Sequence, residues 1–412
     1  MRAITIVGGG QSGLQLGCGL VKRGYDVQII QNRTPEQIRS GNVLSGQCMF
    51  GAALQNERDL ELDFWEDSCP TIDSITFCVP APDGSGQKAI DWNGRLDRPA
   101  RSVDQRVKIP AWMAEFERRG GHITIDDVGI EDLERYARGS DLVIVATGRN
   151  EIAQLFERDV ARSPFDKPQR ALAATYVHGM VPRAEYSAVN FNLIPTVGEY
   201  FVFPALTVSG PCDIMVFEGL PNGPMDCWTD VKTPTEHLDL ARRMLETFLP
   251  WEAERCRNLE LTDSAGILSG RFAPTVRKPI GVLPSGALVL GMADAVCLND
   301  PIAGQGSNSA SKAAKIYMDA IIAHADGPFD AAFMQATFNA YWSDAHYVVD
   351  WSNSLLKPPP PHVLKLMDAA QNQPALARRL ANAFDRPADL FPWFVVPEEA
   401  DRYLNELAVH EG

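Results

Sequence analysis

Three glycines near the start of the chain have the spacing of a phosphate-binding turn. Gly8, Gly10 and Gly13 form a G-x-G-x-x-G pattern between a short apolar run and a segment with apolar residues at helical spacing. Gly8 permits the turn, Gly10 lets a pyrophosphate approach the backbone, and Gly13 lets the helix pack closely on the strand. The free N–H groups at the helix start, at Gln11 and Ser12, favour an anion. The pattern predicts a strand–turn–helix unit that binds a dinucleotide.

A second group of residues suited to a cofactor lies near residue 300. An apolar strand over 287–291 is followed by an Asp, an Asp-Pro pair and a Gly-x-Gly before a helix that we expect from about 307 to 324. A helix N-terminus of this kind stabilises negative charge. The residues concerned are Asp294, Pro301, Gly304, Gln305, Gly306 and Asn308.

Two further strand ends complete the predicted nucleotide site. The second strand ends in Gln31, Asn32 and Arg33, where an Asp or Glu commonly holds the adenosine ribose. Amides can bond a ribose, and Arg33 could stack on adenine or meet a phosphate. The apolar strand over 141–145 leads into Ala-Thr-Gly, and Gly148 would bring the backbone close to the nucleotide.

Composition excludes several classes of protein. The 412 residues are 45% hydrophobic and carry a net charge of −15, which argues against a nucleic-acid or anionic-membrane partner. There is no apolar run of the ~20 residues that a membrane helix needs, and the N-terminus does not resemble a signal peptide. The eight cysteines and seven histidines are dispersed, so we expect reduced thiols, no metal and a cytoplasmic protein.

The order of elements predicts an α/β protein. Residues 1–150 indicate a doubly wound parallel sheet. Strand-like runs dominate 165–270 and predict a β-rich, antiparallel second domain. A strand, a glycine-containing loop and a helix typical of a nucleotide-binding domain follow over 287–324. Residues 328–412 are predicted to be mostly helical.

These motifs together resemble the FAD-dependent aromatic hydroxylase fold of the p-hydroxybenzoate hydroxylase type. The motifs on which this resemblance rests are the glycine turn, the Ala-Thr-Gly after an apolar strand, and the Gly-x-x-Asp with Pro-x-x-Gly-Gln-Gly near 300. The resemblance implies a Rossmann-like FAD-binding domain formed by 1–63, 95–164 and 270–327. It implies an inserted substrate-binding β domain formed by 64–94 and 165–269, and a helical region over 328–412. It also implies that Arg106 contacts a phosphate and that Pro301 shapes the substrate face of the flavin.

Within that fold the chain resembles the oxygenase component of two-component styrene and indole monooxygenases. The resemblance rests on the segments 100–104, 163–172 and 300–306. It implies that FADH2 comes from a separate NADH-dependent flavin reductase and reacts with O2. The resulting flavin C4a-hydroperoxide would epoxidise an aromatic alkene, with no catalytic side chain required. A homodimer is left open.

The subgroup rests on six positions. Indole-type members carry Ser-x-Gln-x-Met where styrene-type members carry Asn-x-Val-x-His, and this chain has Ser45, Gln47 and Met49. Ile72, Ile75 and Ala100 also fit the indole-type pattern. The resemblance therefore implies that these six residues line or border the pocket and that indole is favoured over styrene.

Three alternatives stay open. The chain could be a styrene epoxidase in its primary role, or a single-component NAD(P)H-dependent flavin hydroxylase. A non-catalytic flavin carrier is the third. The sequence has no second G-x-G-x-x-G within another β-α-β unit, which agrees with reduced FAD from a partner.

Overall fold

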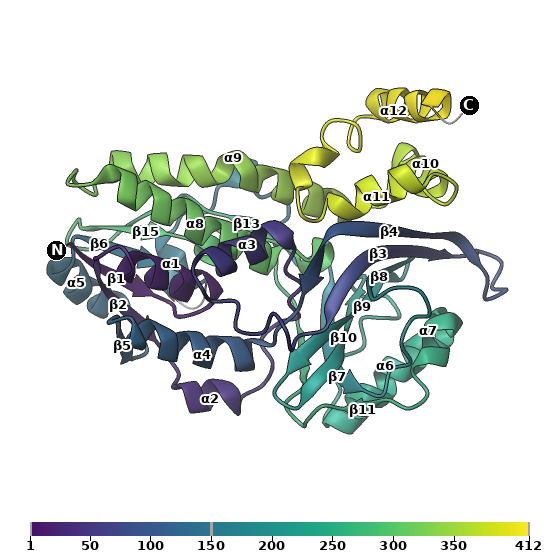
Figure 1. Ribbon diagram of the computed structural model, residues 1–412, viewed down its shortest axis with the longest axis horizontal. Coiled ribbons are helices and arrows are strands. Elements are labelled where there is room, and N and C mark those ends of the chain that lie inside the picture. Colours follow the sequence, from purple (N-terminus) through teal and green to yellow (C-terminus); the bar gives the residue numbers. More distant parts are fainter. Residues whose placement is uncertain (1, 149–150, 411–412) are drawn as a thin grey trace.

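The computed structural model describes residues 2–148 and 151–410, and it places two sheets side by side. Figure 1 shows the first sheet and its helices on the left, the second sheet on the right, and the last helices above the second sheet. The predicted α/β class, with a Rossmann-like core and a helical C-terminal region, is confirmed.

The first sheet has six strands and a parallel centre. β1, β2, β5, β6 and β15 pair in parallel, and β14 pairs antiparallel to β15 at one edge. All four residues of β6 are buried, as expected for a parallel strand covered on both faces. In spatial order the strands are β14 (Ile280–Val282), β15 (Leu288–Gly291), β6 (Leu142–Val145), β1 (Ala3–Val7), β2 (Asp26–Gln31) and β5 (His122–Ile125).

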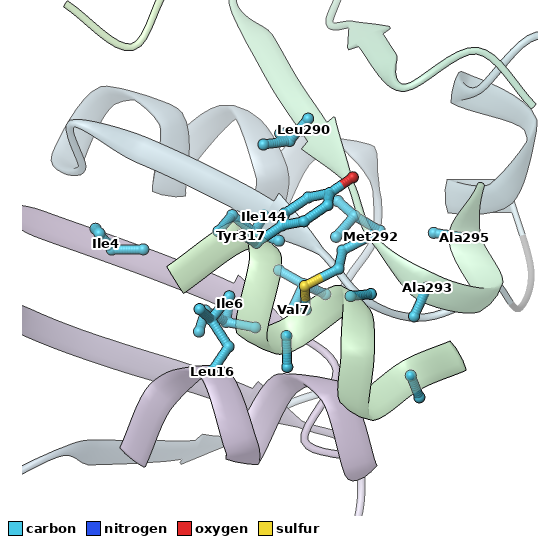
Figure 2. Packing of buried hydrophobic residues seen from close by; sticks show 14 of the residues in the cluster. Ile4, Ile6, Val7, Leu16, Ile144, Leu290, Met292, Ala293, Ala295 and Tyr317 are labelled. Carbon is cyan, nitrogen blue, oxygen red and sulfur yellow. The ribbon is translucent and has the colours of Figure 1, made fainter. Parts of the chain in front are cut away.

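Helices cover this sheet and complete its core. Figure 2 shows Ile6 of β1 next to Leu16 of the first helix, and Ile4 and Tyr317 belong to the same buried cluster. The Tyr317 hydroxyl donates to the carbonyl of Gly291 at 2.8 Å, which connects the helix over Gly306–His324 to the end of β15. The helices of this part are α1 (Gln11–Val21), α2 (Pro35–Arg39), α3 (Gly51–Asp59), α4 (Gln105–Arg118), α5 (Ile130–Gly139), α8 (Gly306–His324) and α9 (Ala331–Leu355).

The second sheet has eight strands and is mixed rather than purely antiparallel. β3 pairs with β8 in parallel, and the other pairs are antiparallel. Its strands are β11 (Glu260–Leu261), β7 (Ala171–His178), β10 (Gly210–Gly219), β9 (Gly198–Thr207), β8 (Ala188–Ile194), β3 (Thr71–Pro80) and β4 (Lys88–Arg101), with β12 (Ile267–Gly270) paired to β7. The predicted boundary between 94 and 95 falls inside β4, because the long hairpin continues to Arg101.

Helices lie against both faces of the second sheet. α6 (Pro234–Phe248) and α7 (Pro250–Arg255) pack on one face, and α6 starts with a capping box between Thr233 and Glu236. The C-terminal helices α10 (Pro361–Ala369), α11 (Pro374–Asn382) and α12 (Pro397–His410) belong to the core of the other face. A Cβ on Gly94 would lie 2.1 Å from the Ala377 carbonyl oxygen, so α11 lies directly on β4.

The remaining elements are short. β13 (Thr275–Val276) and β16 (Cys297–Leu298) form a two-stranded sheet. Single 3-10 turns are η1 (Glu151–Leu155), η2 (Val160–Arg162), η3 (Ala293–Ala295), η4 (Pro301–Ala303) and η5 (Pro387–Leu390). Among the helices of the described chain, none combines the length and apolar character needed to cross a membrane.

Candidate active site

A cavity of about 520 Å³ lies between the two sheets, at the carboxyl edge of the parallel one. Ligands in open α/β sheets bind at this edge. Residues from the glycine turn, the 44–50 segment, the second sheet and the start of α8 line it. They are Gly10, Gln11, Ser12, Leu44, Ser45, Gly46, Gln47, Cys48, Phe50, Gln105, Ala146, Leu172, Ala173, Ala174, Val189, Phe191, Phe201, Phe203, Val216, Leu268, Ser269, Gly270, Arg271, Phe272, Ala293, Asp294, Leu298, Asn299, Pro301, Gly304, Gly306, Ser307, Ala310 and Phe384.

The glycine turn borders this cavity as its spacing predicts. Gly8 has φ +118°, and a Cβ there would lie 2.9 Å from the Ala146 carbonyl carbon. A Cβ on Gly13 would lie 1.9 Å from the Gly8 carbonyl oxygen, whereas a Cβ on Gly10 would meet nothing within 4 Å. No side chain caps the start of α1. The uncapped N–H groups and the open side of Gly10 suit a phosphate group.

The loop over 300–306 and the start of α8, here called the cofactor cradle, also line this cavity. The Asp300 carboxylate accepts from the Ile302 N–H at 3.1 Å, and Gly304 closes the turn at φ +62°. α8 then starts at Gly306 without a side-chain cap, and its first residues line the cavity. Two uncapped helix N-termini therefore border one cavity, an arrangement that favours a ligand with separated negative charges.

Gln305 and Asn308 bind protein groups and hold the cradle in place. Asn308 Nδ2 donates to the Cys48 carbonyl at 2.8 Å, and its Oδ1 accepts from the Phe50 N–H at 2.9 Å. Gln305 Nε2 donates to the Phe384 carbonyl at 2.9 Å. The Asn308 amide thus connects the cofactor cradle to the 48–50 segment, and the Gln305 amide connects it to Phe384. Their direct contact with a cofactor stays a prediction.

The predicted ribose residues support the glycine turn. Gln31 Nε2 donates to the Gly9 carbonyl at 3.2 Å, and Gln31 Oε1 accepts from the Asn32 N–H. Gln31, Asn32 and Arg33 do not belong to the lining of the cavity described above. Gly148 lies against Asp294, because a Cβ there would come within 2.8 Å of the Asp294 carbonyl oxygen.

Arg106 lies in a buried ion-pair network away from the cavity lining. It is 1% exposed, and its guanidinium donates to Asp104 at 2.9 Å and to both Asp263 oxygens at 3.0 Å. The Gly41 carbonyl and the Thr207 hydroxyl accept its remaining N–H groups. A phosphate contact would require Arg106 to leave these partners. In this arrangement it joins α4 to the second sheet.

The six residues predicted for the substrate pocket separate into two groups. Ser45 and Gln47 line the cavity. Ser45 Oγ accepts from Gln105 at 2.9 Å, whereas neither amide atom of Gln47, which is 2% exposed, has a partner among the described residues. A buried amide without partners is costly, which makes Gln47 a candidate to bind a ligand group in the cavity.

The other four lie outside this cavity. Met49 is 1% exposed, and its sulfur accepts from Lys108 Nζ at 3.2 Å. Ile72 and Ala100 face each other across the β3–β4 ladder and are fully buried. Ile75 lines a second cavity beneath the C-terminal helices. None of the four belongs to the lining of the larger cavity.

Sequence reasoning missed the aromatic wall of the cavity. Phe191, Phe201 and Phe203 project from β8 and β9, and Phe384 follows α11. Alternation along the strands signals which residues share a face. It does not signal which face borders the cavity, because both faces of this sheet are covered by helices or the cofactor domain.

A cluster of largely buried carboxyl groups is formed by Glu199, Glu218 and Asp300, and Asp300 begins the cofactor cradle. Desolvation, with the nearby carboxyls of Asp300 and Glu199, raises the pKa of Glu218 well above its usual value. Burial also raises the pKa of Asp300. Arg170 opposes these shifts and pairs with Glu199 at 2.6 Å. The raised pKa therefore favours the neutral form of Glu218.

The Glu218→Gln variant should be more stable than the wild type above pH 7. Native Glu218 has a raised pKa, so the folded state binds more protons, and stability falls as pH rises from the unfolded pKa towards the native one. Glutamine does not ionise and lacks this loss. Urea unfolding at pH 5 and pH 8 tests this, with the exposed Glu185→Gln as the control. A gap between variant and wild type that fails to widen with pH would contradict it.

Comparisons with known proteins identify relatives along the whole chain. Residues 148–255 match a family model described as "Styrene monooxygenase A putative substrate binding domain". The chain is 29% identical to styrene monooxygenase StyA of Pseudomonas fluorescens, over 99% of this chain and 98% of the relative. It is also 29% identical to a StyA from a Pseudomonas species, with the same coverage.

Solved structures show the same fold. A flavoprotein/dehydrogenase from Cytophaga hutchinsonii aligns with TM-score 0.68 at 12% identity, covering all of both chains. The flavin-dependent brominase Bmp2 aligns with TM-score 0.61 at 15% identity, covering 98% of this chain and 93% of the other. The chain thus shares its fold with these two flavin-related proteins.

The similarity over the full length of the chain supports a styrene monooxygenase-like oxygenase. FAD is the implied cofactor. The residues present fit it: two uncapped helix N-termini and the open sides of Gly10 and Gly306 border one cavity. In the described part of the chain, no group of three or more His, Cys, Asp or Glu side chains is arranged to hold a metal.

Proposed function

We propose that the protein is a two-component, FAD-dependent monooxygenase that epoxidises indole at its 2,3-bond, and related aromatic alkenes such as styrene. A separate NADH-dependent flavin reductase would supply FADH2 through a transient encounter. Bound reduced FAD would supply the activation of O2, and the products of indole oxidation would lead to indoxyl and indigo. We place the protein in the cytoplasm and leave a homodimer open.

This chain's residues would bind the cofactor and exclude water. Gly8, Gly10, Gly13 and the first N–H groups of α1 would hold the pyrophosphate. Asp294 and the start of α8 would hold the ribityl and ring portion, and Pro301 would border the substrate side. The apolar wall from β7–β10 would exclude water from the reacting pair.

The observation that favours indole over styrene as the preferred substrate is the unpaired Gln47 amide. Gln47 lines a cavity whose other walls are largely apolar, and its Oε1 has no donor in the described structure. Indole has one N–H donor and styrene has none. A site with a buried acceptor discriminates strongly against a ligand that lacks the matching donor, because the acceptor then stays unpaired.

The direct test is turnover of both substrates with chemically or enzymatically supplied FADH2. We expect indole to have the higher kcat/KM and cells that produce indole to turn blue. A higher kcat/KM for styrene would favour the styrene epoxidase, which the names of the curated relatives make the second candidate. Rapid reduction of the FAD-bound protein by NADH or NADPH alone would instead indicate a single-component enzyme. FAD binding without turnover of either substrate would indicate a carrier.

Gln47→Leu should lower kcat/KM for indole by tenfold or more and leave styrene nearly unchanged. The substitution removes the acceptor while keeping similar volume, and a lost hydrogen bond of this kind corresponds to about 1–3 kcal/mol. Steady-state turnover of both substrates measures the ratio. Equal losses for indole and styrene would show that Gln47 acts by shape alone.

A further inference from the structure

The second cavity has the size and lining of a site for a single aromatic molecule. Its volume is about 120 Å³, and an apolar protein cavity of about 150 Å³ binds benzene. It lies between the second sheet and the C-terminal helices, which Figure 1 shows above β3 and β4. Its lining is mainly aromatic and aliphatic, and includes Ile75, Phe77, Trp92, Trp351, Leu364 and Met367.

Two phenylalanines line both this cavity and the larger one. Phe191 of β8 and Phe384 after α11 belong to both linings, and their ring centroids are 5.1 Å apart. Phe191 packs against Phe201 at 5.0 Å on the side of the large cavity, and Phe384 packs against Trp351 at 4.9 Å on the other side. A pair of rings is thus the partition between two apolar spaces.

The far end of the second cavity reaches the molecular surface. Lys357 and Pro360 are exposed there, and Leu364 of α10 is 38% exposed. Phe384 is held at the opposite end, because its carbonyl accepts from Gln305 in the cofactor cradle. The cavity therefore extends from the surface to a residue joined to the cofactor cradle.

We propose that this second cavity binds one neutral aromatic molecule and serves as a waiting site, from which the molecule passes between Phe191 and Phe384 into the large cavity. An apolar molecule gains from leaving water for such a lining, at about 25 cal/mol per Å² of buried apolar surface. Rotation of a phenylalanine side chain opens the partition without moving the backbone. The binding itself requires no cofactor; only the role as a waiting site rests on the proposed function.

Bromobenzene tests the site without turnover. In crystals of the wild-type protein soaked with it, we expect anomalous bromine density between Trp92 and Trp351. In solution, calorimetry should give two bromobenzene sites for the wild type and one for Leu364→Trp, whose indole ring would fill the outer end. Val396→Trp is the matched control, since Val396 is 36% exposed and lies outside both linings, and it should retain both sites. Thermal unfolding checks that all three proteins fold.

The outcomes separate this inference from the proposed function. Bromine density at the second cavity without any turnover of indole or styrene would sustain the site and overturn the function. Normal turnover without such density, or two sites retained in Leu364→Trp, would overturn the site. If both hold, Leu364→Trp should lower kcat/KM for the aromatic substrate severalfold with kcat unchanged, and an unchanged kcat/KM would overturn the waiting role.

Discussion

Gly13→Ala is expected to weaken FAD binding at least a hundredfold and to destabilise the fold. The new Cβ would lie 1.9 Å from the Gly8 carbonyl oxygen, a backbone atom that no side-chain rotation can move aside. α1 must therefore shift away from β1, which costs about 1–3 kcal/mol or more in a packed region. The same shift displaces the N–H groups that border the cavity. We expect the Kd for FAD to rise at least a hundredfold and the Tm to fall.

Gly10→Ala is the contrasting variant in the same turn. Gly10 has φ −87° and ψ −163°, which alanine adopts readily, and its Cβ would meet nothing within 4 Å. The Tm of the cofactor-free protein should stay unchanged. The methyl group would occupy the space through which the pyrophosphate approaches, so the Kd for FAD should rise about tenfold or more. Fluorescence titration of FAD and thermal unfolding distinguish the two variants. Wild-type FAD affinity in both would contradict this placement of the cofactor.

Lys108→Met is expected to destabilise the protein by about 3–5 kcal/mol, because it leaves a buried carboxylate without its cation. Lys108 Nζ lies 2.7 Å from Glu57 Oε1, and both side chains are almost fully buried. Gln11 Nε2 also donates to that oxygen at 3.0 Å, so the pair supports a residue of the cavity lining. Urea unfolding measures the loss of stability.

A second substitution separates the loss of charge balance from the loss of packing. Lys108→Met with Glu57→Gln removes the unpaired charge and should recover most of the stability. The surface pair Lys365–Asp401 is the control, since both side chains are more than half exposed and Lys365→Met should change little. A double variant as unstable as the single one would show that packing at Lys108, not its charge, determines the effect.

Local sequence predicts the elements that contain the cofactor site. The turn at Gly8–Gly13 and the loop at 300–306 each combine a strand end, glycines and a helix start within a few residues. Such signals are carried by neighbours in the chain, because turn geometry and helix starts depend on local dihedral angles and N–H groups. The fold class and the position of α8, from Gly306 rather than the expected 307, follow from them.

The tertiary structure determines which side chains reach the cavity. Arg106 meets Asp263, which is 157 residues away in the chain, and Ile75 borders a cavity formed by helices nearly 300 residues further on. Gln47 and Met49 lie two residues apart, yet one borders the cavity and the other packs against Lys108. Contacts between distant segments depend on how two sheets and the C-terminal helices pack together. No local sequence pattern encodes that packing. The spacing of glycines and helix starts therefore predicts the cofactor cradle, whereas the packing of distant segments determines which residues contact the cradle and which aromatic side chains line the cavity.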